Sequence, residues 1–271
     1  MTDAEIKSRL RGIRCFLLDM DGTIYLGDKL FPFTISFLDT VLKTGRTYRF
    51  FTNNSSKNRQ AYLEKLSRMG IVVPPDWMYI SNQVAVKVLG ERYPDGSLMV
   101  LGTPCLLRDF EAAGFRVNTG EVPDAVVLGF DTTITYDKIW AACDAIRAGA
   151  AFYGVNPDWN CPVEDSGWMP DCGSMAKVIE ASTGAVPEFF GKPTRHTLEF
   201  ILEQTGFQPE ELAVIGDRLY TDIALAQDSA VTSILVLTGE ATREDAAASP
   251  TPPDIMVESL AKLRDLLNQL A

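Results

Sequence analysis

Two aspartates at the end of an apolar run carry the strongest chemical signal in this chain. Asp19 and Asp21 follow the run Cys15–Leu18, with Gly22 and Thr23 directly behind them. A run that is apolar on both faces predicts a buried parallel strand, and open α/β sheets place their ligands at the carboxyl ends of such strands. Alternate strand residues point the same way, and a glycine lets the chain turn sharply. These residues therefore predict a corner that can hold a metal ion and a phosphate group.

Two other interpretations compete for this stretch. An acidic turn can simply end a strand. A calcium-binding EF-hand loop that starts at Asp19, with Asp21 third, needs a glycine at its sixth position, where this chain has Ile24. Gly22 stands at the fourth position of such a loop, so the spacing excludes it. The choice between an acidic turn and a site depends on the other motifs.

The charge of the chain limits its partners. The 271 residues include 46% hydrophobic ones, enough for a full core, and 25 basic against 36 acidic side chains give a net charge of −11. This field repels nucleic acids and anionic membranes, so we expect neither as a partner. A phosphate ester would need local positive charge at its site, from a divalent metal and a placed lysine.

Several other classes are disfavoured by what the sequence lacks. An odd number of cysteines with no C-x-x-C pair indicates reduced thiols and a cytosolic protein. The acidic N-terminal residues contain no apolar segment typical of a signal peptide, and no run approaches the length of a membrane span. His196 is the only histidine, and no G-x-S-x-G, G-x-G-x-x-G or Walker motif occurs. The five cysteines are Cys15, Cys105, Cys143, Cys161 and Cys172.

Apolar runs alternate with segments of helical period, which predicts an α/β protein with a mostly parallel sheet covered by helices on both faces. Ile35, Leu38 and Leu42 share one face of a predicted helix, and we expect this face to pack into the core. Pro74-Pro75 and Pro187 bracket a middle region with strand and helix repeats of its own. The predicted strands are 15–18, 48–51, 98–101, 125–128, 151–154, 213–215 and 233–237.

We therefore predict a discontinuous core domain, 1–82 and 187–271, with an inserted second domain at 83–186.

Three further motifs stand at predicted strand ends or helix starts. Thr52 and Asn53 follow the strand 48–51 and precede a helix near 58–69, where they could cap the helix or grip an anion through a hydroxyl and backbone N–H groups. Gly191-Lys192-Pro193 precedes another helix. This motif could be a turn with a solvated lysine and a proline at the first helical position.

The last motif contains two more carboxylates. Asp217 and Asp222 follow the predicted strand 213–215 and the turn residue Gly216. They could serve as metal ligands or, like Asp19 and Asp21, simply end a strand.

Taken in order, Asp-x-Asp-Gly-Thr, Thr-Asn-Asn, Gly-Lys-Pro and Gly-Asp-Arg-x-x-Thr-Asp resemble the four signature motifs of the haloacid dehalogenase superfamily. Within it they are most similar to the NagD-like, nitrophenyl phosphatase branch. The resemblance extends from Asp19 to Asp222. It implies a doubly wound Rossmann-like core, with an α/β cap inserted between the second and third motifs.

The resemblance also implies roles. Asp19 would be the nucleophile that forms an aspartyl phosphate, and Asp21 the general acid and then the general base. Mg²⁺ would bind Asp19, the backbone carbonyl of Asp21 and Asp217, with Asp222 supporting them from outside the coordination sphere. The phosphate would contact Met20, Asp21, Thr52, Asn53 and Lys192, with Thr52 and Lys192 also counted as catalytic.

The predicted function is hydrolysis of a phosphomonoester of a small cytosolic metabolite. A phosphotransferase or phosphomutase would share the aspartyl phosphate and differ in the acceptor. A phosphate sensor would not need both Asp19 and Asp21. A receiver-like domain would place its lysine last, whereas Lys192 precedes Asp217.

The predicted cap resembles the family less closely. Asn156-Pro157-Asp158 and Pro170–Ser174 look like cap segments near the substrate, but Asp171 and Cys172 depart from the small residues common there. Trp159 and Trp168 could stack on a flat leaving group or pack in a buried or interface position. By analogy with capped relatives, we expect a homodimer formed through the cap.

Overall fold

The computed structural model describes residues 1–163 and 167–270. These residues form two compact units. Unit 1 consists of Met1–Phe51, Leu63–Tyr79 and the described chain from Leu198 onward, and unit 2 consists of Thr52–Tyr62 and Ile80–Thr197. The predicted inserted domain, 83–186, stays a prediction. The compact units also place the short segment Thr52–Tyr62 with the middle of the chain.

Unit 1 is built on a sheet with strand order β15-β14-β13-β1-β4-β5. The pairs that join β1 to β13 and β4, and β14 to β13 and β15, are parallel. A small hairpin, β2 with β3, follows β1. The bounds are β1 Cys15–Leu18, β2 Tyr25–Leu26, β3 Lys29–Leu30, β4 Thr47–Thr52, β5 Met78–Ile80, β13 Leu212–Gly216, β14 Thr232–Val236 and β15 Ile255–Val257.

The central strands of this sheet are buried because their residues are apolar on both faces. Every residue of β1 and of β13 is buried, as expected for parallel strands covered by helices on both sides. The runs predicted at 15–18, 48–51, 213–215 and 233–237 coincide with β1, β4, β13 and β14 to within a few residues. The predicted α/β class with parallel strands is confirmed.

Helix α2 corrects one prediction about the core. Leu38 is buried, but Ile35 and Leu42 are 42% and 46% exposed, so the expected core stripe is wrong for two of its three residues. The helix contacts α10, and its buried face follows a stripe with i, i+3, i+4 and i+7 spacing. That stripe contains Thr34, Phe37, Leu38 and Val41.

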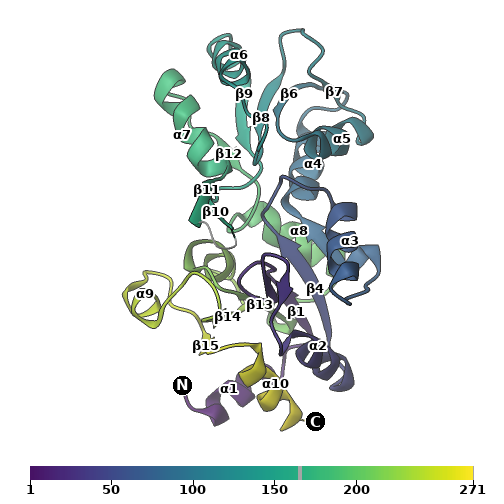
Figure 1. Ribbon diagram of the computed structural model, residues 1–271, viewed down its shortest axis with the longest axis vertical. Helices are drawn as coiled ribbons and strands as arrows, with labels where there is room; N and C mark the ends of the chain where they lie inside the picture. Colours follow the sequence, from purple (N-terminus) through teal and green to yellow (C-terminus); the bar gives the residue numbers. More distant parts are fainter. Residues whose placement is uncertain (164–166, 271) are drawn as a thin grey trace. The chain divides into compact units, whose positions relative to one another are not determined.

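The remaining helices of the unit include two, α3 and α8, whose first residues belong to unit 2. Figure 1 shows α1, α2 and α10 near one another at the end that carries both termini. Helices α3 and α8 confirm those predicted after the second and third motifs. The bounds are α1 Asp3–Leu10, α2 Thr34–Lys43, α3 Arg59–Arg68, α8 Arg195–Thr205, α9 Arg243–Ala248 and α10 Leu260–Asn268, with short helical turns η1 Pro75–Trp77, η2 Pro209–Glu211 and η3 Leu219–Ile223.

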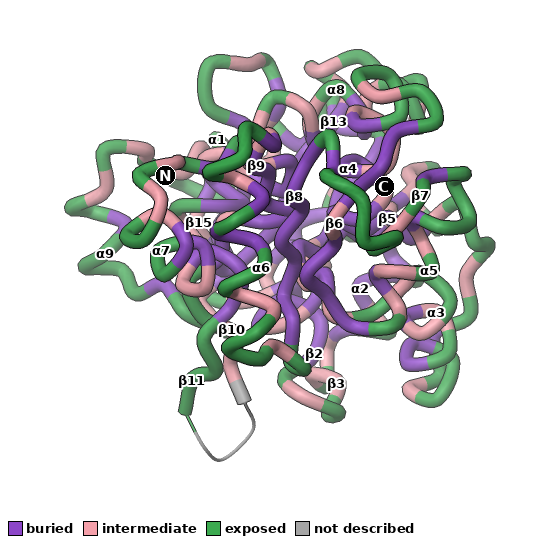
Figure 2. The backbone as a smooth tube through the Cα atoms, turned by 90° about the horizontal axis from the view of Figure 1, so that it is seen from above, coloured by how far each residue is buried: buried purple, intermediate pink, exposed green. Residues whose placement is uncertain are grey.

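Unit 2 contains a sheet with strand order β12-β9-β8-β6-β7, and its pairs are parallel. Figure 2 shows β8 buried along its length. An antiparallel hairpin, β10 with β11, stands apart from this sheet. The bounds are β6 Ser97–Leu101, β7 Arg116–Val117, β8 Ala125–Leu128, β9 Ala151–Gly154, β10 Asn160–Val163, β11 Gly167–Pro170 and β12 Glu188–Phe189.

Helices lie on both faces of this second sheet. Figure 1 shows α6 and α7 on one side and α4 and α5 on the other. Thr135 and Asp171 cap the starts of α6 and α7, since their side chains accept backbone N–H groups of the first turn. The bounds are α4 Ser81–Arg92, α5 Pro104–Ala112, α6 Tyr136–Arg147 and α7 Cys172–Thr183.

Two expectations from composition can be compared with the structure. The five cysteines are free thiols. Among the described residues, no helix combines the length and the apolar character that crossing a membrane requires.

Candidate active site

Neighbouring parallel strands bring three carboxylates of unit 1 together. Asp19 directly follows β1, and its backbone N–H donates to the carbonyl of Ile215 in β13 at 2.8 Å. Asp217 directly follows β13, and Asp222 lies in the turn η3. Because the carboxyl ends of parallel strands meet at one sheet edge, residues nearly 200 positions apart in the chain become neighbours.

The carboxylates of Asp19, Asp217 and Asp222 are close enough to share one cation. One oxygen from each lies within 4.8 Å of the others. Asp217 and Asp222 are almost fully buried. Anionic side chains gathered at low solvent exposure repel each other, so a positive ion would relieve the repulsion.

Asp217 provides the clearest indication that this cluster suits a cation. Its Oδ2 accepts the backbone N–H of Glu240 at 2.7 Å, whereas its Oδ1 is buried and has no hydrogen-bond partner among the described residues. Burial raises the pKa of Asp217, and the negative charge of Asp222 raises it further. Buried unpaired carboxylate oxygens are costly. The oxygen donors therefore fit a hard divalent cation such as Mg²⁺.

Glycines make room for this carboxylate. A Cβ built at Gly22 or at Gly239 would overlap the side chain of Asp217. Gly22 also has a φ of +83°, which side chains disfavour. The glycine of the first motif is thus required for two reasons, the turn that it makes and the space that it leaves.

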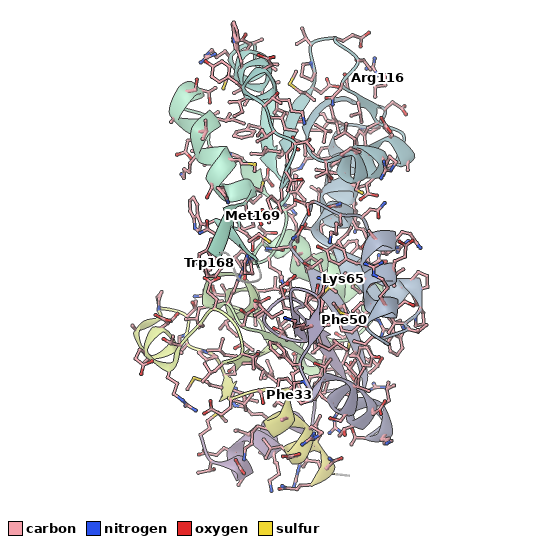
Figure 3. All side chains as sticks on the ribbon, in the orientation of Figure 1. Phe33, Phe50, Lys65, Arg116, Trp168 and Met169 are labelled. Carbon is pink, nitrogen blue, oxygen red and sulfur yellow. The ribbon has the colours of Figure 1, made fainter. Side chains whose placement is uncertain are left out.

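Asp21 stands beside a buried lysine that sequence reasoning did not identify. Burial raises the pKa of Asp21, and the charge of Lys65 opposes that rise. Lys65 lies 3.9 Å above the ring of Tyr25 and 3.9 Å from Asp28 Oδ1. Figure 3 labels this side chain on α3.

A sequence signal for Lys65 exists, although it is weak. On α3, Lys65 follows Tyr62 by three residues and precedes Leu66, and all three are buried. A lysine on an apolar helical stripe is unusual because burial of its charge is unfavourable without a partner.

The second and third motifs meet inside unit 2. The side-chain oxygen of Asn53 accepts the backbone N–H of Lys192 at 2.8 Å, and its amide nitrogen donates to the backbone carbonyl of Lys192 at 2.9 Å. Thr52 Oγ1 accepts the N–H of Asn54 at 3.2 Å. The alternative of a turn with a solvated lysine and an N1 proline is wrong, because Lys192 is 2% exposed and α8 begins two residues after Pro193.

The two tryptophans considered for stacking are exposed. Trp159 precedes β10 and Trp168 lies in β11, and they are 46% and 55% exposed. Figure 3 shows Trp168 and Met169 on this hairpin. A buried position is therefore wrong for both, whereas the stacking role and the interface position stay predictions.

The predicted site residues thus fall into two sets. The structure brings Asp19, Asp217 and Asp222 together in unit 1, and it brings Asn53 and Lys192 together in unit 2.

Comparisons with known proteins identify the family of this chain. A family model described as haloacid dehalogenase-like hydrolase matches residues 16–116, and a second model of the same kind, HAD-hydrolase-like, matches residues 189–263. The chain is 32% identical over 251 residues to an acid sugar phosphatase of Staphylococcus epidermidis, which covers 93% of this chain and 96% of that protein.

Solved structures show the same fold. A 4-nitrophenylphosphatase from Thermotoga maritima is 42% identical, with a TM-score of 0.90 over 95% of this chain and 98% of that one. A glycerol phosphate phosphatase from Mycobacterium tuberculosis in complex with magnesium is 29% identical, with a TM-score of 0.87 over 97% of this chain and 80% of that one.

Proposed function

Because this chain belongs to the haloacid dehalogenase-like hydrolase family and is a phosphatase, we propose that it hydrolyses small phosphorylated metabolites through an aspartyl phosphate with Mg²⁺. The observation that carries this proposal is the acidic cluster beside the end of β1, in which the buried Oδ1 of Asp217 has no hydrogen-bond partner within residues 1–163 and 167–270.

The proposed reaction has two steps. In the first, a carboxylate oxygen of Asp19 bonds to phosphorus while the bond to the leaving oxygen breaks, and Asp21 gives that oxygen a proton. In the second, water bonds to phosphorus, Asp21 takes a proton from the water, and the bond between phosphorus and Asp19 breaks. Inorganic phosphate leaves, and both carboxylates return to their starting states.

Asp19, the backbone carbonyl of Asp21 and Asp217 would hold Mg²⁺, while Asp222 would interact with these ligands. The ion would supply positive charge close to the phosphoryl oxygens. The carboxylates themselves cannot neutralise a dianionic substrate, which is why the chain needs cationic groups at this point.

Phosphate binding would fall to residues from the first three motifs. The hydroxyl of Thr52, the backbone of Asn53 and the ammonium of Lys192 would contact phosphoryl oxygens. Backbone groups of Met20 and Asp21 would contribute from the first motif. The side chain of Met20 is buried, and its carbonyl accepts the N–H of Ile24 at 3.0 Å, so its backbone N–H is the group suited to this role.

For the substrate, the names of the relatives suggest sugar phosphates first, with glycerol phosphate and nitrophenyl phosphate as further candidates. We further propose a cytosolic protein that acts without nucleic acid or membrane partners and forms a homodimer through the middle region. Light scattering at micromolar concentration would test the dimer, and a mass near 29.8 kDa would contradict it.

A panel of phosphate esters with and without Mg²⁺ tests the reaction. We expect release of inorganic phosphate from sugar phosphates, and its loss on chelation of divalent ions. Formation of a rearranged or transferred phosphate ester without free phosphate would indicate a phosphotransferase. If no ester in the panel reacts, the proposed function is wrong.

A further inference from the structure

A chain of buried polar side chains runs through unit 2, and no signature motif accounts for most of it. It begins at the backbone N–H of Phe130, which donates to Ser55 Oγ at 2.7 Å. Ser55 Oγ donates to Asn156 Oδ1 at 2.7 Å. Asn156 Nδ2 then donates to Asp158 Oδ2 at 2.9 Å and to Asp171 Oδ1 at 3.0 Å. The members are 0–5% exposed.

This chain ends on the two motifs proposed to bind phosphate. Asp158 Oδ2 also accepts a hydrogen bond from Asn53 Nδ2 at 2.7 Å. The same carboxamide bonds to both backbone groups of Lys192, at 2.8 Å and 2.9 Å. Both N–H groups of the Asn53 carboxamide therefore have acceptors, Asp158 and the carbonyl of Lys192, and its oxygen has a donor.

The pattern fixes the orientation of Asn53. A flipped carboxamide would point its oxygen at the carboxylate of Asp158 and at the carbonyl of Lys192, and would leave the N–H of Lys192 facing an amide N–H group. Each of these contacts is unfavourable in a buried site. Asp158 thus selects the one orientation in which Asn53 can bond to the backbone of Lys192.

Gly191 shows how closely this region is packed. A Cβ at Gly191 would lie 2.7 Å from Asn53 Oδ1 and 3.0 Å from the carbonyl oxygen of Val155. The glycine of the third motif therefore allows the Asn53 side chain to approach the backbone that carries Lys192.

We propose that Asp158 and the Asn53 side chain are positioning residues that set the place of Lys192 relative to the backbone of Thr52 and Asn53. This inference rests on the proposed function, because Lys192 and the second motif act on a phosphate only if the protein is a phosphatase. Asp158 does not contact the phosphate in this account. It acts through Asn53.

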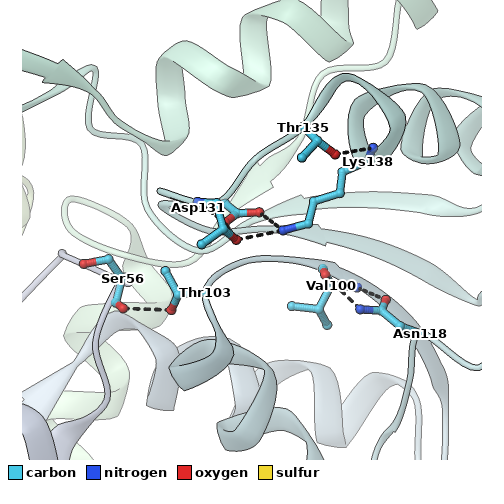
Figure 4. Close-up of polar contacts among 8 residues, drawn as sticks. Ser56, Val100, Thr103, Asn118, Asp131, Thr135 and Lys138 are labelled. Atoms are coloured by element: carbon cyan, nitrogen blue, oxygen red, sulfur yellow. Dashed lines mark hydrogen bonds and ion pairs between the residues drawn. The ribbon is translucent and has the colours of Figure 1, made fainter.

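The experiment compares Asp158→Ala and Asp158→Asn with a matched variant, Asp131→Ala. Asp131 is another fully buried carboxylate of unit 2. It accepts Thr133 N and Oγ1 at 2.8 and 2.6 Å and Lys138 Nζ at 2.8 Å, and no described contact joins it to Asn53 or Lys192. Figure 4 shows this cluster. Loss of a buried carboxylate is thus common to both alanine variants.

Activity on 4-nitrophenyl phosphate is the first readout. We expect Asp158→Ala to lower kcat by about 100-fold at equal folded fraction, because small displacements of catalytic groups have effects of this size. The loss should fall on kcat more than on KM, since Lys192 offsets charge that develops in the transition state. Asp158→Asn keeps an oxygen acceptor, so its kcat should be about 10-fold higher than that of Asp158→Ala. Asp131→Ala should keep kcat within about threefold of the wild type.

Hydrogen exchange of backbone amides, resolved by NMR, is the second readout and does not depend on activity. In Asp158→Ala the N–H of Lys192 should exchange at least about tenfold faster, as expected for a local opening near this hydrogen bond. The N–H of Phe190, which donates to the carbonyl of Gly154 at 3.1 Å, should be unchanged.

The two readouts separate the possible failures. A wild-type protein that hydrolyses no ester would refute the proposed function, and exchange at Lys192 would then decide the positioning role alone. Unchanged exchange at Lys192, or a loss of kcat in Asp158→Ala no larger than in Asp131→Ala, would overturn the inference.

Discussion

Buried aspartates occur in both compact units, and their surroundings are opposite. In unit 1, Asp217 has a buried Oδ1 without a partner among the described residues, and Asp222 lies close enough to raise its pKa. In unit 2, Asp158 Oδ2 accepts two amide N–H groups, at 2.7 and 2.9 Å. The Asp217 carboxylate thus keeps an oxygen suited to a cation, whereas Asp158 Oδ2 accepts hydrogen bonds from two amide groups.

This difference separates two uses of the same side chain. A buried carboxylate with repulsive neighbours and unmet bonding capacity is costly to the protein alone and therefore favours a cation. A buried carboxylate that accepts several hydrogen bonds fixes its donors in place. We expect the first type to control chemistry and metal affinity, and the second to control the placement of other groups.

The largest expected loss of activity comes from variants of Asp19 and Asp21. If these residues only ended a strand, the two substitutions would have similar effects. Asp19→Asn should lower kcat by more than about 10⁴-fold, because an amide neither attacks phosphorus nor binds Mg²⁺ as an anion. Asp21→Asn should lower it by roughly 10²–10⁴-fold, because proton transfer is lost while the backbone carbonyl remains. Steady-state kinetics would measure both.

Trapping the phosphoenzyme makes the same comparison sharper. With nitrophenyl phosphate, whose leaving group hardly needs a proton, Asp21→Asn should accumulate a phosphorylated enzyme, and Asp19→Asn should not. Rapid quench with intact-mass detection would show it. Phosphate trapped on any residue other than Asp19, or equal loss of metal affinity in both variants, would contradict the assignment.

Asp217→Asn tests directly whether the Asp217 carboxylate binds the metal. It should weaken Mg²⁺ binding by at least about 10–100-fold. It should also raise the Tm of the metal-free protein, because it removes a buried charge that Asp222 repels. In the wild type, Mg²⁺ at 100 times its Kd should add about 2.7 kcal/mol to the free energy of unfolding.

Calorimetry with and without Mg²⁺ would measure both effects of Asp217→Asn. Asp158→Asn serves as the matched control from unit 2, and it should lower the Tm with little change in the Mg²⁺-induced shift. If the metal-free Asp217→Asn protein is less stable than the wild type, the Asp217 charge does not destabilise the fold, and the proposed difference between Asp217 and Asp158 is wrong.

Gly191→Ala tests the dense packing in unit 2. The added methyl group would press on Asn53 and the carbonyl of Val155, and we expect a loss of about 1–3 kcal/mol in the free energy of unfolding. Gly90, inside α4, has only Phe115 at 4.0 Å from such a Cβ. Gly90→Ala should therefore be neutral or stabilising by up to about 1 kcal/mol. Denaturant unfolding would compare the two, and equal effects would argue against the packing account.

The smallest effect concerns a carboxylate at the surface of unit 2. Two hydrogen bonds from Arg92, at 2.6 and 2.7 Å, lower the pKa of Glu188 to about 2. The hydrogen bond with His196 makes a smaller contribution in the same direction. Because the folded-state pKa lies below the ordinary value of 4.5, the stabilisation is present above about pH 4.5 and is lost as the pH falls through about 2.

Glu188→Gln measures this contribution. The Glu188 side chain is 43% exposed, so the variant should be less stable by under about 1 kcal/mol at pH 7. Thermal unfolding of both proteins between pH 7 and pH 2 should show the Tm difference shrinking below pH 4.5. A constant difference over this range would mean that the pKa of Glu188 is not lowered by folding.

The sequence by itself determined the framework of this protein. Apolar runs on both faces predicted β1 and β13, since a strand covered by helices on both sides needs apolar residues at every position. The resemblance of the four ordered motifs then identified the family, which the family models confirm. These signals are local, so they can be found without knowledge of the fold.

Tertiary structure decided which of several compatible patterns is used. Helix α2 carries two overlapping apolar stripes, and its packing, including contacts with α10, leaves Ile35 and Leu42 exposed. The bonds from Asn53 to Lys192 join residues 139 positions apart, and the burial of Lys65 depends on Tyr25 from another element. Each of these outcomes depends on which partner reaches a given side chain, and partners distant in sequence are brought near only when the chain has folded.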